Sequence, residues 1–491
     1  MEEKQRILKH PILDFKRGRK INFHFEGERT EGYENESIAA ALFASGVKVF
    51  RKSKRFSHPE GWFCGIGKCS SCLMRVNGIP SIRTCITPVR EEMQVELQGA
   101  KGILPDKASA KVARKEEHVQ VLIIGSGPAG LEAGITSRKL GLTALIIDEN
   151  PVPGGQLIKQ THKFFGSKKE YAGLRGFEIA RVMLAELKKY EGAYLTETSA
   201  IGYYTEEKTG KHKFLAVQKQ NDSYQLLEIN ADNIIITSGA NENYLPFPKN
   251  YLPGVYGAGG VQTLMNVYGV KPGNKALIIG AGNVGLIVGY QLLQAGVEVK
   301  AVIEAMAHVG GYLVHASKLA RLGVPILLRH TIKEVRGEEH VSSATIIEVD
   351  ENMQPIEGTE RELDVDLILI AVGLSSSTKI PFQAGCEKLF VPELGGWVPI
   401  HNENMETTIK GIYVAGDVSG IAEASTAMLE GRIAGAAIAE KETYNPEMAR
   451  RVKEDALTEL NELRESSLLK AVAAGKRKCQ QEWNEVKNNG N

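Results

Sequence analysis

Residues 119–130 read VQVLIIGSGPAG, an apolar run that leads directly into Gly125-x-Gly127-x-x-Gly130. The apolar run predicts a buried strand, and the glycines predict a tight turn that opens a helix. In such a unit the first glycine makes the turn, the second lets the backbone approach a pyrophosphate, and the third lets the helix pack closely on the strand. The anion then lies on the helix N-terminus. This stretch predicts a dinucleotide-binding fold.

An acidic residue stands where that fold needs one. Asp148 follows the predicted strand Ala144–Ile147 and comes 23 residues after Gly125. A carboxylate at this position accepts hydrogen bonds from the ribose hydroxyls of the adenosine half. Because strand, glycines and acid are in register, the prediction does not depend on the glycines alone.

The same pattern occurs a second time. Leu277–Gly285 repeats the strand and turn with Gly280-x-Gly282-x-x-Gly285, and Glu304 follows 24 residues after the first glycine. A glutamate here suits an unphosphorylated ribose and repels a 2′-phosphate, so it favours NAD over NADP. The pattern leaves open a fold that holds another nucleotide or has lost its ligand.

The chain before these two units carries four cysteines with the spacing C-x4-C-x2-C-x12-C. They are Cys64, Cys69, Cys72 and Cys85. The first two gaps match the loop of plant-type 2Fe–2S proteins, whereas the third is shorter than in those proteins. Gly65 and Gly67 permit the tight backbone path that such a loop requires. A structural zinc ion with four thiolate ligands is the alternative, although zinc sites usually combine two C-x2-C pairs.

Composition narrows the range of partners and compartments. The chain has 491 residues, with 60 Lys and Arg against 59 Asp and Glu, and this balance argues against nucleic acid as the main partner. No apolar stretch is long enough to span a bilayer, and the N-terminus lacks the apolar region of a secretory signal. We therefore expect a cytoplasmic protein that meets a membrane only peripherally, through a complex. Cys386 and Cys479 stand alone and are expected to be inert.

The alternation of apolar strands with helices predicts an α/β chain with two Rossmann-like domains, preceded by a small β-rich metal-binding domain. In the small domain, residues 20–25 alternate as a strand and Asn77-Gly78 predicts a hairpin turn. The expected divisions are 1–100 for the cysteine domain, 101–118 for a linker, 119–250 and 374–440 for the two parts of the first nucleotide-binding domain, 251–373 for the second, and 441–491 for a helical tail.

Two stretches of sequence resemble a group of known oxidoreductases. Residues 63–89, FCGIGKCSSCLMRVNGIPSIRTCITPV, resemble the small 2Fe–2S subunit of hydrogen cyanide synthase and of opine oxidases. Residues 238–255 are similar to the larger flavoprotein subunit of hydrogen cyanide synthase and to the α subunits of opine oxidase, dye-linked proline or hydroxyproline dehydrogenase and heterotetrameric sarcosine oxidase. The resemblance implies that both subunits are fused here, with a β-grasp, ferredoxin-like 2Fe–2S domain at the N-terminus.

The resemblance also implies FAD in the first nucleotide-binding domain. Gly154-Gly155-Gln156 resembles the flavin-approach loop of thioredoxin-reductase-like flavoproteins, and 411–417 resembles their second FAD motif, in which Asp417 would contact the ribityl chain. Such enzymes carry a redox C-x-x-C early in the nicotinamide domain. The corresponding residues 254–262 contain no cysteine, so the flavin's electrons need another outlet, and the cluster is an available one-electron carrier.

The resemblance implies an electron-transfer subunit of a flavin-dependent complex that oxidises a secondary amine or amino acid. A separate β subunit with its own FAD would oxidise the substrate, FMN could lie between the subunits, and a quinone or carrier protein would accept the electrons. No catalytic residue is therefore assigned to this chain. One alternative is a self-contained NADH-dependent FAD and 2Fe–2S reductase that serves an oxygenase or ferredoxin. Another is a non-catalytic scaffold or sensor.

Overall fold

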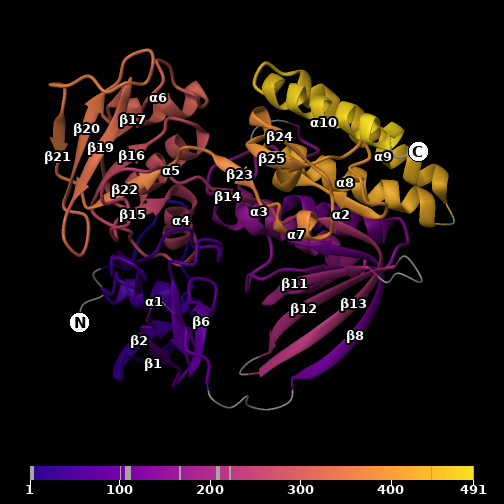
Figure 1. Ribbon diagram of the computed structural model, residues 1–491, viewed down its shortest axis with the longest axis horizontal. Helices are drawn as coiled ribbons and strands as arrows, with labels where there is room; N and C mark the ends of the chain where they lie inside the picture. The colour runs from indigo at the N-terminus through magenta and orange to yellow at the C-terminus, as the bar shows by residue number, and fades with distance from the viewer. Residues whose placement is uncertain are drawn as a thin grey trace. The chain divides into compact units, whose positions relative to one another are not determined.

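The computed structural model describes residues 5–99, 101–105, 112–164, 167–205, 211–220, 223–443 and 445–489. The chain divides into two compact units (Figure 1). One unit comprises Met1–Ser109 and Glu242–Gly373, and the other comprises Ala110–Asn241 and Leu374–Asn491. Each unit therefore joins two segments that lie far apart in the sequence. Among the described residues, none of the helices combines the length and apolarity that a membrane crossing requires.

The first unit begins with a five-stranded sheet in the order β2-β1-β7-β5-β6, which shares a core with α1. The elements of this domain are β1 (Lys20–Phe25), β2 (Glu28–Tyr33), α1 (Ile38–Ala44), β3 (Arg51–Lys52), β4 (Pro59–Glu60), β5 (Leu73–Val76), β6 (Ile79–Arg83) and β7 (Gln94–Glu96). Strand β1 pairs antiparallel with β2 and parallel with β7, which gives the mixed sheet of the expected β-grasp domain. The predicted hairpin is present, because Asn77 and Gly78 link β5 to β6 with φ of 49° and 79°.

The rest of the first unit is a Rossmann-like fold around the parallel sheet β15-β22-β16-β17-β18. Its elements are β15 (Val255–Gly257), α4 (Ala258–Gln262), the π-helix η2 (Thr263–Val267), β16 (Lys275–Ile279), α5 (Asn283–Gln294), β17 (Glu298–Glu304), α6 (Leu313–Arg321), β18 (Ile326–Leu328) and β22 (Leu367–Ile370). An antiparallel sheet adds β19 (His330–Arg336), β20 (Ser343–Glu348) and β21 (Arg361–Leu363). The predicted second nucleotide-binding unit is therefore present as β16, α5 and β17.

The second unit contains the first Rossmann-like fold, with the sheet order β10-β9-β8-β13-β12-β11 and β26 beside β13. Its first segment comprises β8 (Ala113–Ile124), α2 (Pro128–Lys139), β9 (Ala144–Ile147), η1 (Gly155–Lys159), α3 (Gly176–Lys189), β10 (Ala193–Leu195), β11 (Thr198–Thr205), β12 (His212–Gln220) and β13 (Ser223–Ile236), followed by β14 (Ala240–Glu242). Strand β8 begins at Ala113, inside the stretch expected to be a linker, because its polar residues pair along β13 from Gln225 onward.

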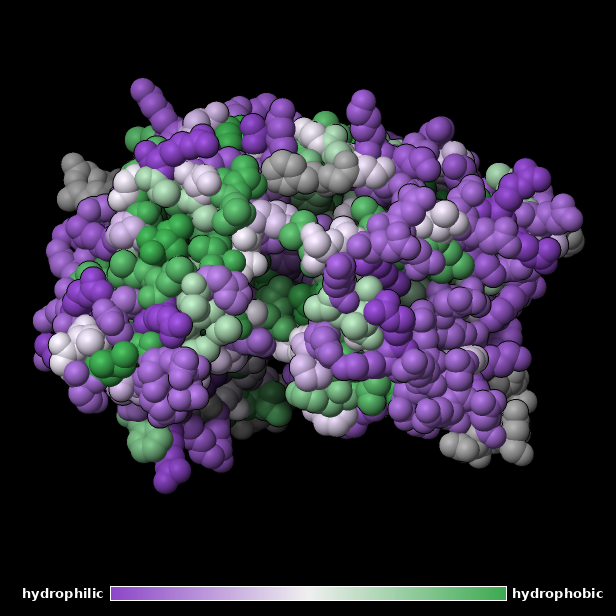
Figure 2. All heavy atoms as spheres, turned by 90° about the horizontal axis from the view of Figure 1, so that it is seen from above, coloured by the Kyte–Doolittle hydropathy of each residue, from purple (hydrophilic) through white to green (hydrophobic). Residues whose placement is uncertain are grey.

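The second unit is completed by the C-terminal part of the chain. Its elements are β23 (Leu374–Ser376), α7 (Lys379–Gln383), β24 (Lys388–Val391), η3 (Pro392–Leu394), β25 (Gly396–Pro399), β26 (Ile412–Val414), η4 (Gly416–Ser419), α8 (Ala424–Glu442), α9 (Pro446–Glu465) and α10 (Lys470–Asn489). The tail is helical, as predicted. Ala456 and Leu460 of α9 are buried in the core that includes α8, and Cys479 of α10 is buried beside Leu394. Seen from above in Figure 2, the outer side of α9 and α10 is largely hydrophilic.

Candidate cofactor sites

The four cysteines predicted to bind a cluster come together around one loop. Cys64, Cys69 and Cys72 lie between β4 and β5, and Cys85 follows β6. The thiol of Cys64 neighbours those of Cys69 and Cys85, and Cys85 also neighbours Cys72. The hairpin of β5 and β6 thus returns the chain to the start of the loop and places the fourth cysteine beside the others.

The surroundings of these thiols suit thiolate ligands. The Lys68 N–H donates a hydrogen bond to Cys64 Sγ at 3.4 Å. Hydrogen bonds from the thiols of Cys69 and Cys85 hold the pKa of Cys64 well below its usual range, and the same contacts raise the pKa of Cys69 and of Cys85. Cys64, Cys72 and Cys85 are almost fully buried, whereas Cys69 is partly exposed. Buried sulfurs that accept backbone hydrogen bonds are characteristic of iron–sulfur sites, so the donor set fits a cluster.

The four sulfurs form one continuous series of neighbours, Cys69, Cys64, Cys85 and Cys72. Within the described ranges, no three His, Cys, Asp or Glu side chains gather into a group that could hold a metal ion. Cys64 is linked to Cys69 and Cys85, while Cys72 is linked to Cys85. A 2Fe–2S cluster distributes its four thiolates over two irons, whereas a structural zinc ion takes all four itself. Both groups take four thiolates, so the four neighbouring sulfurs fit the two-iron cluster as well as zinc.

The start of the cluster loop packs on the residues at and just before α4. Trp62 Nε1 donates to the carbonyl of Gly260 at 3.0 Å, and the Gly257 N–H donates to the carbonyl of Phe63 at 3.2 Å. A Cβ on Gly260 would lie 1.9 Å from that Phe63 oxygen, so only glycine permits this approach. The cluster loop is therefore in close backbone contact with α4, whose residues include no cysteine.

The first glycine turn has the shape that the sequence predicts. Gly125 has φ of 112°, and a Cβ there would lie 2.4 Å from the carbonyl oxygen of Thr237. A Cβ on Gly130 would lie 1.9 Å from the carbonyl oxygen of Gly125, which shows how closely α2 approaches the strand. A Cβ on Gly127 would meet no atom within 4 Å. Gly125 and Gly130 thus serve the packing of the protein, while Gly127 faces open space at the N-terminus of α2.

Asp148 lies at the end of β9, where ribose hydroxyls are expected. Its Oδ2 accepts hydrogen bonds from the N–H and hydroxyl of Ser126 at 2.7 and 2.6 Å, and its Oδ1 accepts two from Asn150 at 2.8 and 2.9 Å. A carboxylate has about four acceptor positions, so a ribose hydroxyl would replace one of the two side-chain donors. The role of Asp148 in binding ribose stays a prediction.

The predicted flavin-approach loop lies against the same turn. The Gly154 N–H donates to the carbonyl of Ser126 at 3.0 Å, and Gly154 has φ of 118°. A Cβ on Gly155 would lie 2.7 Å from the Cα of Gly127. Gln156, the third predicted residue, has an exposed side chain in η1. The loop therefore forms one wall of the space that Gly127 faces.

The second predicted FAD motif, which contains Asp417, lies beside the first. Asp417 follows β26 in η4, and a Cβ on the preceding Gly416 would lie 3.0 Å from the Cβ of Ala129 in α2. Burial raises the pKa of Asp417 to about 6, although a hydrogen bond from the Ala422 N–H, at 3.5 Å, opposes this. The two motifs that are far apart in the sequence thus meet at the N-terminal end of α2. Together with the open face of Gly127, these residues fit FAD.

The second glycine turn repeats the geometry of the first. Gly280 has φ of 109°, a Cβ on Gly285 would lie 2.1 Å from its carbonyl oxygen, and a Cβ on Gly282 would meet no atom within 4 Å. Glu304 accepts the Ala281 N–H at 2.8 Å, as Asp148 accepts the N–H of Ser126. Its other oxygen accepts the Met306 N–H at 3.0 Å. The turn retains the shape needed for a nucleotide, so these residues fit NAD as well as other adenine nucleotides.

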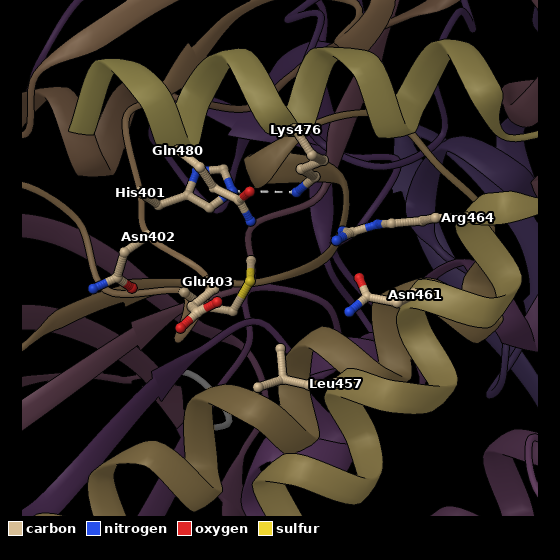
Figure 3. A pocket seen from close by; sticks show the side chains of 9 residues that line it. His401, Asn402, Glu403, Leu457, Asn461, Arg464, Lys476 and Gln480 are labelled. Carbon is tan, nitrogen blue, oxygen red and sulfur yellow. Dashed lines mark hydrogen bonds between the residues drawn. The ribbon is translucent and has the colours of Figure 1, made fainter. Parts of the chain in front are cut away.

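Sequence reasoning did not find a buried group of charges behind Asp417. Glu430 of α8 forms ion pairs at 2.7 Å with Arg464 of α9 and with Lys476 of α10. Both cations line a cavity of about 120 Å³, into which Asn461 and Gln480 also project (Figure 3). Nothing in the amphipathic pattern of the tail marks Lys476 as buried, because its neighbours in sequence include several exposed lysines and arginines.

Comparisons with known proteins place most of the chain in two families. Residues 119–431 match the family described as pyridine nucleotide-disulphide oxidoreductase. Residues 18–100 match the 2Fe-2S iron-sulfur cluster binding domain. Both matches agree with the folds described above.

Several curated proteins are similar in sequence. An opine oxidase subunit from Agrobacterium tumefaciens is 28% identical over 330 residues, which are 65% of this chain and 64% of that protein. The alpha subunit of sarcosine oxidase from Corynebacterium sp. is 22% identical over 450 residues, 87% of this chain and 44% of that protein. The HcnB subunit of hydrogen cyanide synthase from Pseudomonas protegens is 26% identical over 335 residues, 65% of this chain and 69% of that protein. The chain thus spans less than two thirds of the opine and sarcosine oxidase subunits.

Two solved structures are similar to this chain in fold. L-proline dehydrogenase from P. horikoshii superposes with a TM-score of 0.67 and 25% identity, covering 91% of this chain and 79% of that one. Thioredoxin reductase of T. acidophilum superposes with a TM-score of 0.54 and 20% identity, covering 66% of this chain and 99% of that one. The second likeness shows the fold alone.

Proposed function

Since this chain belongs to the pyridine nucleotide-disulphide oxidoreductase family and carries a 2Fe–2S binding domain, we propose that it is the electron-transfer subunit of a flavin-dependent amino-acid dehydrogenase complex. The substrate is a secondary amine or amino acid such as proline, hydroxyproline, sarcosine, an opine or glycine. The names of the relatives, which include opine oxidase, sarcosine oxidase and L-proline dehydrogenase, support this substrate class.

One observation carries the proposal. The cluster loop is packed on Gly257 and Gly260, in the segment where thioredoxin-reductase-like enzymes have their redox cysteines. In those enzymes the disulfide takes electrons from the flavin. In this chain the same segment contains no cysteine and is in contact with the cluster loop, which supports the cluster as the acceptor of the flavin's electrons.

The chain's own residues hold the two redox groups. When bound, FAD takes up electrons in pairs and a 2Fe–2S cluster passes them on singly. The N-terminus of α2 and the open face of Gly127 would hold the pyrophosphate, Asp148 would accept the ribose hydroxyls, and Asp417 would accept a ribityl hydroxyl. The loop from Gly154 to Gln156 would contact the flavin, and the four cysteines would hold the irons. None of these side chains acts on the amine.

The amine is oxidised in a partner under this proposal. That partner is a β subunit of the amine-oxidase class with its own FAD, and an FMN would lie at the interface between the subunits. A quinone or a carrier protein would be the electron acceptor of the complex. The chain works in the cytoplasm, and any peripheral association with a membrane is made through its complex.

The division of labour is tested by purifying the tagged chain from its native host, with and without its partner. Alone, it should contain FAD, iron and sulfide but should not reduce a dye with proline, sarcosine or glycine. A fraction that retains a second, FAD-containing subunit should reduce the dye with one of these substrates. Turnover of an amine by the chain alone would overturn the proposal.

The second candidate function is a self-contained NADH-dependent reductase. It is favoured by the intact turn Gly280-x-Gly282-x-x-Gly285 and by Glu304, which accepts only backbone hydrogen bonds among the described residues. Anaerobic mixing with NADH separates the two candidates. Rapid bleaching of the flavin supports the reductase, whereas an unchanged flavin spectrum supports the complex subunit.

A further inference from the structure

The loop that carries Asp417 is held from behind by one buried carboxylate. Glu430 Oε2 accepts hydrogen bonds from the Gly416 N–H at 2.8 Å and from the Ser419 hydroxyl at 2.8 Å. Gly416 and Ser419 are the first and last residues of η4, so Glu430 fixes both ends of the turn. The side chain of Glu430 is only 2% exposed. Together with the Ser376 hydroxyl, which donates to the Asp417 carbonyl at 2.6 Å, Glu430 therefore sets where the loop lies.

The tail helices supply the charges that keep Glu430 in place. Its Oε1 is 2.7 Å from Arg464 Nη2 and 2.7 Å from Lys476 Nζ. The ammonium group of Lys476 also donates to the Ser419 hydroxyl at 2.7 Å and points toward His401 (Figure 3). The side chain of Lys476 is only 3% exposed. His401 is buried as well, and its own burial lowers its pKa to about 3, so the imidazole is neutral. The two cations are the direct partners of an otherwise uncompensated buried carboxylate.

We infer that Lys476 and Arg464 are positioning residues for FAD: through Glu430 and Ser419 they set the loop that presents Asp417 to the ribityl chain. The inference rests on the proposed FAD site and extends it to the tail, which the second FAD motif itself does not include. The tail helices α9 and α10 are then part of the flavin-binding fold, because each contributes one of the two cations. Water cannot replace a buried cation as the partner of Glu430, so loss of either cation should weaken the binding of FAD.

The charges around Asp417 influence the pH at which its carboxyl group ionises. The groups that face Asp417 are the Ala422 N–H, the Glu430 carboxylate of α8 and the Lys476 ammonium of α10. Glu430 raises the pKa of Asp417 and Lys476 lowers it. Removal of the ammonium should therefore move the ionisation of Asp417 to higher pH as well as loosen the loop.

The test compares Lys476→Met with Lys478→Met in the full chain. Lys478 lies on the same helix, but it is about half exposed and pairs with Glu393 at the surface, which makes it the matched control. FAD affinity is measured by fluorescence quenching from pH 5 to 8. Wild type and Lys478→Met should bind FAD with the same pH midpoint. Lys476→Met should bind at least about tenfold more weakly and with a higher midpoint, and Lys476→Arg should restore most of the affinity.

Two further measurements keep the outcome decisive. Thermal unfolding of the flavin-free variants separates a weakened site from a failure to fold. Ser419→Ala removes only one hydroxyl and replaces Lys476→Met in the comparison if that variant does not fold. Equal FAD affinity and pH midpoint in wild type and in the variant compared would overturn the inference. Failure of the wild type itself to bind FAD would instead overturn the proposed function.

Discussion

Gly127 offers a test in which protein stability and ligand binding respond differently to one methyl group. The backbone of Gly127 has φ of −69° and ψ of −175°, which alanine adopts without strain. A Cβ at this position meets no atom of the protein within 4 Å. The space that the methyl group would fill is the space that the second glycine of such a turn leaves for a pyrophosphate. Gly127→Ala should therefore affect the ligand more than the fold.

The two effects can be estimated separately. Replacing glycine by alanine at a compatible φ stabilises a protein by about 0.4–1 kcal/mol, and the poorer N-cap offsets a similar amount, so the flavin-free stability should change by less than about 1 kcal/mol. A methyl group forced against a close-packed partner costs about 1–3 kcal/mol, which corresponds to a loss of FAD affinity of roughly 5- to 150-fold. In Gly130→Ala the methyl would lie 1.9 Å from the Gly125 oxygen, so that variant should lose stability as well.

The assay combines urea unfolding of the flavin-free proteins with FAD titration of the folded ones. Gly127→Ala should have the urea midpoint of the wild type and a clearly weakened affinity for FAD. Gly130→Ala should have a lowered urea midpoint. If Gly127→Ala binds FAD as tightly as the wild type, the pyrophosphate does not lie on this turn and the assignment of the first nucleotide site is wrong.

Three other substitutions test separate parts of the structure. Cys85→Ser should lower iron content and visible cluster absorbance without loss of FAD, and retention of a full cluster would exclude Cys85 as a ligand. Gly260→Ala places a Cβ 1.9 Å from a backbone oxygen of the cluster loop and should cost about 1–3 kcal/mol in urea unfolding, with faster loss of the cluster; unchanged values would refute the contact between the cluster loop and α4. Arg432→Met leaves the nearly buried Glu132, now 2.8 Å from the guanidinium, without its partner and should cost about 3–5 kcal/mol, against less than about 1 kcal/mol for the exposed Arg450→Met.

The shape of the glycine turns and the gathering of the four cysteines could be predicted because each depends on residues that are close in the sequence. The conformation of Gly125 and the close approach at Gly130 follow from residues within one strand, turn and helix. The return of Cys85 to the cluster loop follows from a hairpin whose turn, Asn77-Gly78, is explicit in the sequence. Such features require no knowledge of how distant segments pack.

The contacts that join distant segments could not be predicted from one sequence. Trp62 donates a hydrogen bond to Gly260, which is 198 positions away in the sequence. No pattern in either segment predicts that the two are in contact. Lys476 stands among exposed lysines and arginines, so only the packing of α10 shows that it is buried beside Glu430. The start of β8 at Ala113 was missed for a related reason, because a polar strand is recognisable only through its partner, β13.

The central claim is that electrons pass from this chain's flavin to its own cluster, and flash reduction measures that step directly. The flavin of the fully loaded chain is reduced by a photogenerated one-electron donor under anaerobic conditions, and flavin and cluster absorbance are followed together. The account predicts that flavin absorbance recovers as cluster absorbance bleaches, at one rate that does not change with protein concentration. Reduction of the cluster that does not accompany flavin reoxidation, or whose rate rises in proportion to protein concentration, would contradict it.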